Sequence, residues 1–167
     1  MGMGELAVTA DASGVLTTIG LGSCVGIVLV DPADRRIGLG HVIFPRAPKR
    51  AVAEPGKYAD TAVATLIAAL ARLGSPCSQL VAVLVGGARM FSFERPLNID
   101  VGASNLAVIR EALGAAQIPI RVEATGGSIG RSVRAEARDG VVSVRSGSAG
   151  TELYRVTGSE LVEGALR

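Results

Sequence analysis

The sequence has one histidine, two cysteines and no tryptophan among its 167 residues, and only 3% of its residues are aromatic. So few aromatic side chains provide no stacking platform of the kind that binds single-stranded nucleic acid. The 17 basic and 15 acidic residues give a formal net charge of +2, which is too balanced to attract nucleic acid or a membrane surface. One histidine and two distant cysteines are also too few ligands for a structural zinc site. We therefore predict no metal, no cofactor and no nucleic-acid partner.

Charge is missing altogether from residues 12–30, a run of 19 positions that is long enough to be considered as a membrane span. Its four glycines, two serines and two threonines, and the β-branched residues after Cys24, instead favour two buried strands joined by a turn. Near the amino end, Glu5 stands where a signal peptide would carry basic residues. Two cysteines without a disulfide framework fit a reducing compartment. We predict a soluble, cytoplasmic protein with no membrane insertion.

The 22 glycines, and a core that must be built from small aliphatic residues, indicate a strand-rich chain with tight turns. Alternating or continuous apolar patterns predict strands at 14–19, 24–30, 36–44, 80–85, 120–123, 132–137 and 141–145. Helical spacing of apolar residues predicts helices at 58–73 and 104–117. A chain of this length buries one good core. We therefore predict a single domain over residues 1–167, with its core at 14–145 and a peripheral tail at 146–167.

The single histidine, His41, must supply any imidazole that a mechanism needs. It lies at the end of an apolar strand, and the preceding strand begins at Cys24, 17 positions earlier. Neighbouring strands joined by a short turn usually pair antiparallel, which brings the start of one beside the end of the other. This pairing predicts that Cys24 and His41 lie within reach of each other. A nearby imidazole lowers the pKa of a thiol and returns its proton to a leaving group, so the pair is a candidate nucleophile and general base.

Glycines flank this cysteine on both sides. Gly22 and Gly26 allow a sharp turn and leave room for a substrate carbonyl, and the backbone of Gly22 and Ser23 is a candidate to hold an oxyanion. The order Gly-Ser-Cys-Val-Gly resembles a nucleophile elbow, but an elbow is followed by a helix, whereas the residues after Cys24 favour a strand. The residues alone leave a second interpretation open, in which Cys24 is a small buried apolar residue and His41 is structural.

Five stretches of the sequence form an ordered set of motifs. They are GLGSCVGIVLVDP continuing to GLGHVIFP, then KYADTAVATLIAAL, VLVGGARMF, VGASNLAVIREAL and GGSIGRSV. Together they resemble the CheD family of chemoreceptor glutamine deamidases, over about residues 14–145. By this resemblance Cys24 is the nucleophile, His41 is the base and acid, and Thr18, six positions before the cysteine, orients the imidazole. The neighbouring Thr17 matches less well. The implied reaction is hydrolysis of selected glutamine side chains to glutamate in methyl-accepting chemotaxis receptors, with release of ammonia.

The resemblance also implies an α+β fold, in which mixed β-sheets pack together and are flanked by helices, similar to the cysteine hydrolase fold of deamidating toxins. The implied partners are the cytoplasmic domains of chemoreceptors and a CheC-type phosphatase of the response regulator CheY. Three positions depart from the family pattern: Ser104 replaces an arginine, Ser128 replaces an asparagine, and an acidic residue is displaced to Glu123. These departures motivate an alternative function, a weakly catalytic or non-catalytic chemotaxis binding module that regulates the phosphatase.

Two further residues are candidates for the border of the site, and each has a structural alternative. Gly87 follows a predicted strand and either lines the site or simply makes a turn. Arg131 either contacts substrate or braces a loop. The run GGSIGR, which contains this arginine, lacks the following helix of a phosphate-binding loop, so nucleotide binding is not predicted. Cys77 is expected to be structural, because no histidine remains to pair with it.

Overall fold

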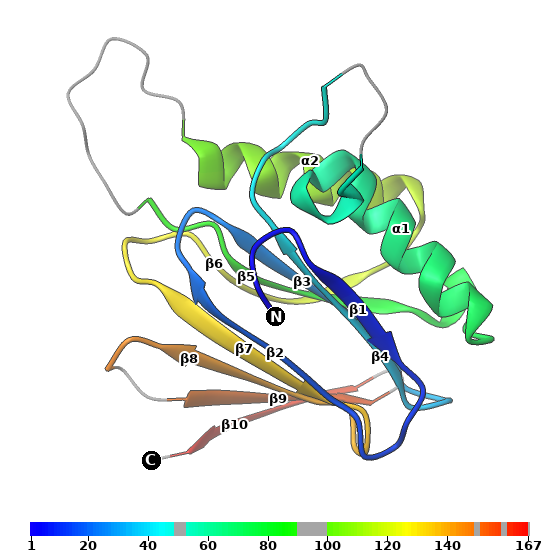
Figure 1. The fold of residues 1–167 in the computed structure, drawn as a ribbon. Helices are drawn as coiled ribbons and strands as arrows, with labels where there is room; N and C mark the ends of the chain where they lie inside the picture. The colour runs from blue at the N-terminus through cyan, green and yellow to red at the C-terminus, as the bar shows by residue number, and fades with distance from the viewer. Residues whose placement is uncertain (49–52, 90–99, 149–150, 158–159, 167) are drawn as a thin grey trace, which may run out of the picture.

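The computed structural model describes residues 1–48, 53–89, 100–148, 151–157 and 160–166, which form two five-stranded β-sheets and two α-helices. The sheets pack face to face, and both helices cover the opposite face of the first sheet (Figure 1). This confirms the predicted α+β architecture of packed mixed sheets flanked by helices. In the described ranges, no helix is long and apolar enough to cross a membrane.

The first sheet has the strand order β1-β4-β3-β5-β6. Its strands are β1 (Leu6–Thr9), β3 (Val25–Asp31), β4 (Arg36–Val42), β5 (Val81–Gly86) and β6 (Ile120–Thr125). Neighbours pair antiparallel except β5 and β6, which are parallel because the chain returns between them through helix α2. Every residue of β3 is buried. Val25, Ile27 and Leu29 belong to the core under the helices, whereas Val28 and Val30 belong to the core between the two sheets.

The second sheet has the order β10-β9-β8-β7-β2, and all its neighbours are antiparallel. Its strands are β2 (Val15–Leu21), β7 (Arg131–Glu136), β8 (Val141–Ser146), β9 (Thr151–Thr157) and β10 (Glu160–Leu166). Strand β2 is not the buried strand that the charge-free run predicts, because one of its faces is open to solvent. Only Thr18 and Leu21 are fully buried in it. Its register with β7 shifts between these two residues, after which the chain turns toward Cys24.

The two long helices fall close to their predicted positions. Helix α1 (Ala59–Arg72) packs on the first sheet and is followed by Gly74, the predicted stop. Helix α2 (Val101–Ala115) begins three residues before the predicted start at Ser104. The Asp100 side chain causes this earlier start, since it accepts a hydrogen bond from the Ala103 N–H at 2.9 Å and caps the helix. Two short 3-10 helices, η1 (Pro55–Lys57) and η2 (Cys77–Gln79), precede α1 and β5.

Three of the observed strands, β1, β9 and β10, are not predicted by the sequence patterns. Strand β1 has four half-buried residues, so its side chains show no clear alternation. The tail from residue 146 is expected to be peripheral, yet it supplies β9 and β10 to the edge of the second sheet, and Tyr154 is only 7% exposed. Backbone pairing with β8 places this segment in the sheet although its side-chain pattern is weak.

Candidate functional site

Cys24 and His41 lie at neighbouring strand ends of the first sheet. In the pairing of β3 with β4, His41 is opposite Gly26. Cys24 comes two residues before Gly26, so its side chain belongs to the same face, and it packs against the core between the sheets. Diagonal neighbours of this kind lie roughly 7–8 Å apart, and Gly26 places no side chain beside them. The thiol and the imidazole therefore share one end of the space between the sheets.

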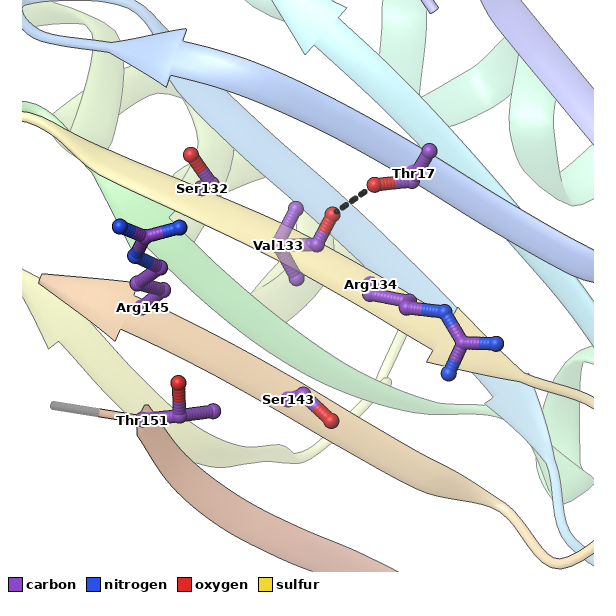
Figure 2. A pocket seen from close by; sticks show the side chains of 7 residues that line it. All are labelled: Thr17, Ser132, Val133, Arg134, Ser143, Arg145 and Thr151. Carbon is purple, nitrogen blue, oxygen red and sulfur yellow. Dashed lines mark hydrogen bonds between the residues drawn. The ribbon is translucent and has the colours of Figure 1, made fainter. Parts of the chain in front are cut away.

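Thr18 connects the second sheet to this histidine. Its hydroxyl oxygen Oγ1 lies 2.8 Å from His41 Nδ1, and the two residues are only 1% and 2% exposed. Thr17 points the other way, because its hydroxyl donates to the Val133 carbonyl at 3.0 Å on the outer face of the sheet (Figure 2). The alternation of side chains along β2 brings Thr18, and not Thr17, to the imidazole.

The other ring nitrogen of His41, Nε2, is buried and has no hydrogen-bond partner within the described residues. The backbone of this histidine is fixed by the amino-terminal segment: the Gly4 N–H donates to the His41 carbonyl at 2.8 Å, and the His41 N–H donates to the Glu5 carbonyl at 3.0 Å. A buried polar atom without a partner is unfavourable for folding and needs an explanation. Nε2 is the atom through which His41 would act as a base toward Cys24.

The loop after β5 holds the Cys24 turn. The Gly87 N–H donates to the Cys24 carbonyl at 2.8 Å, and the Ala88 N–H donates to the Gly22 carbonyl at 2.7 Å. Gly86 has a φ of +103°, and a Cβ at this position would lie 2.4 Å from the Cys24 carbonyl oxygen, so a larger residue does not fit. Because its N–H is engaged, Gly87 fixes the Cys24 backbone and does not present this group to a substrate.

The backbone N–H groups of the Cys24 turn differ in whether they already donate a hydrogen bond. The Gly22 N–H donates to the Gly20 carbonyl at 3.0 Å. Across the described ranges, the N–H groups of Ser23 and Cys24 donate to no backbone carbonyl. Of the backbone N–H groups around Cys24, these two are therefore candidates to donate to a substrate oxygen.

Arg131 makes the hydrogen bonds of a loop brace, one of its two predicted roles. Its guanidinium donates to the Gly126 carbonyl at 2.7 Å. The Gly126 N–H in turn donates to the Gly86 carbonyl at 2.9 Å, and the Arg89 N–H donates to the Gly127 carbonyl at 2.8 Å. The glycine pairs of the motifs VLVGGARMF and GGSIGRSV, Gly86-Gly87 and Gly126-Gly127, are thus joined directly. Through Gly126, Arg131 supports the loop after β5 that holds Cys24.

Two shallow depressions lie on the outer face of the second sheet. One, of about 320 Å³, is lined by Gly20, Gly130, Arg131, Ser132, Arg145 and Gly147. The other, of about 290 Å³, is lined by Thr17, Ser132, Val133, Arg134, Ser143, Arg145 and Thr151 (Figure 2). Neither is lined by Cys24 or His41. Both depressions lie on the other side of β2 from Cys24 and His41.

Asn105 is a site residue that no sequence reasoning identified. It lies in α2 with none of its surface exposed, and its Nδ2 donates to the Ser23 carbonyl at 3.2 Å and to the Ile43 carbonyl at 2.9 Å. These carbonyls directly precede Cys24 and closely follow His41. One amide therefore ties together the two strand ends that carry the reactive pair. The only sequence signal was its place in the VGASNLAVIREAL motif.

Burial sets the protonation of the reactive pair. Desolvation raises the pKa of the Cys24 thiol, although its own backbone N–H offsets part of the effect. Desolvation also lowers the pKa of His41, helped by the positive charge of the Met1 amino group and opposed by Glu5. This differs from the expectation that the imidazole lowers the pKa of the thiol, because both groups are shielded from water and the neutral form of each is favoured.

The three departures from the family pattern lie outside this cluster. The Ser104 hydroxyl donates to the Asp100 carbonyl at 2.8 Å within α2. Glu123 pairs with Arg110, whose Nε lies 3.1 Å from its carboxylate. Ser128 is exposed in the loop between β6 and β7. In the described part of the chain, no three metal-ligating side chains gather at one place. Met90 and Phe91, at the end of the motif VLVGGARMF, lie outside the described residues.

The structure thus combines two packed sheets, helices on one side, and a cysteine turn near a buried histidine that contacts a buried threonine. A family model described as "CheD chemotactic sensory transduction" matches residues 44–146. A Thermotoga maritima protein named "Chemoreceptor glutamine deamidase CheD" is 37% identical over 153 residues, covering 92% of this chain and 94% of the relative. Proteins named "Probable chemoreceptor glutamine deamidase CheD" are similar too: that of Symbiobacterium thermophilum is 40% identical over 148 residues (86% and 89% covered), and that of Desulfitobacterium hafniense is 38% identical over 147 residues (87% and 91% covered). The chain belongs to the CheD family.

Proposed function

We propose that this protein hydrolyses glutamine side chains of chemoreceptors to glutamate, with Cys24 as nucleophile, His41 as base and acid, and Thr18 as the residue that orients the imidazole. The observation that carries the proposal is the 2.8 Å contact between Thr18 Oγ1 and His41 Nδ1, which leaves the buried Nε2 without a partner on the face that Cys24 shares. The substrate is supported by the names of the relatives: one is named a chemoreceptor glutamine deamidase, and two are named probable chemoreceptor glutamine deamidases.

The first half of the reaction starts from a neutral thiol and a neutral imidazole. His41 Nε2 takes the proton of Cys24 Sγ while the sulfur attacks the amide carbon of glutamine, and the carbonyl electron pair moves onto oxygen. The N–H groups of Ser23 and Cys24 donate to this oxyanion. The intermediate then collapses: the C–N bond breaks, ammonia leaves with the proton from Nε2, and a thioester remains on Cys24.

The second half returns the enzyme to its starting state. His41 Nε2 takes a proton from water as the water oxygen attacks the thioester carbon. The C–S bond breaks, and the Cys24 thiolate recovers the proton from Nε2. The product acid loses its own proton to solvent and becomes the glutamate carboxylate. Acid–base help of this kind typically contributes roughly 10²–10⁴-fold in rate, so loss of His41 is expected to cost that much.

The proposed substrates are the cytoplasmic domains of chemoreceptors, and the proposed location is therefore the cytoplasm. A CheC-type phosphatase is proposed as a second partner on the strength of the family resemblance. The alternative function is a binding module with little chemistry of its own. The two functions differ in whether the wild-type protein converts glutamine, and the proposed deamidase needs Cys24 for this conversion.

Mass spectrometry of receptor cytoplasmic fragments, incubated with each variant, tests the proposal directly. Wild type should release ammonia and produce the mass gain of amide-to-acid conversion. Cys24→Ala should abolish both, and His41→Ala should slow both by roughly 10²–10⁴-fold. Cys77→Ala is the matched control, since this second free cysteine only donates weakly to the Ala116 carbonyl at 3.4 Å.

The threonine pair offers a second matched comparison. Thr18→Val should lower the rate sharply, whereas Thr17→Val should not, because the Thr17 hydroxyl faces the outer side of the sheet. Full activity of Cys24→Ala would exclude Cys24 as the nucleophile. Failure of wild type to convert glutamine in receptor fragments would favour the binding module.

A further inference from the structure

The hydroxyl of Thr18 has two hydrogen-bonding neighbours but only one proton to donate between them. Oγ1 lies 2.9 Å from the Met1 carbonyl oxygen and 2.8 Å from His41 Nδ1. A carbonyl oxygen only accepts, whereas a hydroxyl has one proton to donate and lone pairs with which to accept. The Thr18 proton is therefore directed to Met1, and the Thr18 oxygen is left to accept from the ring.

The direction of these two hydrogen bonds assigns the tautomer of His41. Since Nδ1 must donate to Thr18, the neutral ring carries its proton on Nδ1 and a lone pair on Nε2. Nε2 is the buried nitrogen that has no partner among the described residues. We propose that the Met1 carbonyl is a positioning group which, through Thr18, keeps His41 in the one neutral tautomer that can take a proton at Nε2.

Loss of the Met1 carbonyl is expected to change the protonation of Nε2, the other nitrogen of the His41 ring. Without the Met1 carbonyl, the Thr18 hydroxyl is free to donate to Nδ1, and the ring proton then resides on Nε2. A ring protonated at Nε2 cannot accept the thiol proton at that atom. In a Ser-His-Asp triad, the wrong histidine tautomer lowers kcat by roughly 10⁴-fold, which shows how large such an effect becomes.

The amino-terminal segment is fixed by hydrogen bonds to both sheets near Thr18 and His41. The Met1 nitrogen donates to the Thr17 carbonyl at 2.7 Å, and the Met1 side chain packs against the core between the sheets. On the other side, Gly4 and Glu5 exchange backbone hydrogen bonds with His41. The Met1 carbonyl is thus fixed relative to both Thr18 and His41.

Two preparations, one with and one without the Met1–Gly2 peptide, test the assignment. Protein made with an additional residue ahead of Met1 keeps the Met1–Gly2 peptide, and protein made to begin at Gly2 lacks it. Because His41 is the only histidine, nitrogen-15 labelling of histidine gives one pair of ring signals. The first preparation should show a protonated Nδ1 and an unprotonated Nε2 at a pH where the ring is neutral. The second should show the Nε2-protonated form gaining population.

A second test measures kcat and KM for glutamine deamidation, and this test rests on the proposed function. The protein that begins at Gly2 should lose kcat with KM unchanged, by no more than the roughly 10²–10⁴-fold that general base catalysis contributes. Adding Thr18→Val to either preparation should remove the difference between them, because the effect of Met1 passes through this hydroxyl. Thr17→Val should leave the difference intact.

The possible failures are distinguishable. An Nε2-protonated ring in the preparation that keeps Met1 would overturn the assignment without any variant, and so would an unchanged tautomer and kcat in the protein that begins at Gly2. If neither preparation deamidates receptor fragments, the proposed function fails, while the tautomer still decides the role of Met1. Circular dichroism shows whether both preparations are folded.

Discussion

At the scale of single residues, the reactive pair is unusual in being held neutral. Many reactive cysteines have a depressed pKa because a positive group lies beside the thiol. Here His41 is buried and Cys24 is half-buried between the two sheets, and desolvation raises the pKa of the thiol and lowers that of the imidazole. The nucleophile is therefore expected to lose its proton to His41 only as it attacks, which protects an otherwise reactive thiol at rest.

The same burial makes a prediction about stability. The unfolded chain binds a proton at His41 near a pH of about 6.5, whereas the folded protein binds it only at lower pH. Between these values the unfolded state holds more protons, so the free energy of unfolding should fall as the pH drops from 6.5, by at most about 1.4 kcal/mol per pH unit. Denaturant unfolding measured between roughly pH 5 and 7 checks this slope. His41→Gln should flatten it, and an equal slope in that variant would assign the effect to other groups.

At the scale of elements, helix α2 acts on the site through one side chain. Asn105→Ala leaves the Ser23 and Ile43 carbonyls without their donor, and each buried group left unpaired is expected to cost about 1–3 kcal/mol in stability. The strand ends would also move relative to each other, and a 1 Å misplacement of reacting groups lowers a rate by up to about a hundredfold.

Unfolding curves and kcat of the folded variant measure the two effects of Asn105. Ser104→Ala is the matched control one residue away, because its hydroxyl bonds only within the helix. Asn105→Ala should lose both stability and activity relative to this control. Identical behaviour of the two variants would show that the amide does not join the strand ends.

The sequence predicts the elements that have a strong local pattern, and it does not predict contacts between distant residues. Helices and central strands have strong local patterns, and the hairpin logic that relates Cys24 to His41 needs only strand order and a short turn. Thr18 was found through the family resemblance, since nothing in its spacing reveals a bond to a residue 23 positions away. Asn105 contacts carbonyls 82 and 62 positions away, and Met1 contributes only its backbone, so neither role leaves a local trace. Strands β9 and β10 are likewise defined by pairing and not by pattern.

At the scale of the whole molecule, the two halves of the second sheet make different contacts with the rest of the protein. Strand β2 forms one edge and reaches the histidine through Thr18. Strand β9 lies beyond β7 and β8 from that edge, and it contributes Tyr154 to the core between the sheets. The first sheet carries Cys24 and His41. The second sheet contacts His41 through Thr18 at one edge, and its strands β7, β8 and β9 contribute apolar side chains to the core between the sheets.

These different contacts predict that a mutation in β9 lowers the free energy of unfolding and leaves the activity unchanged. Tyr154→Ala should lower the free energy of unfolding by about 3–5 kcal/mol, the range for large buried aromatic side chains, because Tyr154 is only 7% exposed. At temperatures where the variant is still fully folded, its kcat/KM on receptor fragments should equal that of wild type, since two strands separate β9 from β2. Arg155→Ala, at the next and exposed position, is the control for a change in β9 without loss of core. A fall in kcat/KM of folded Tyr154→Ala would show that packing in β9 is coupled to the geometry of Thr18 and His41, and that the sheet acts as one rigid unit on the site.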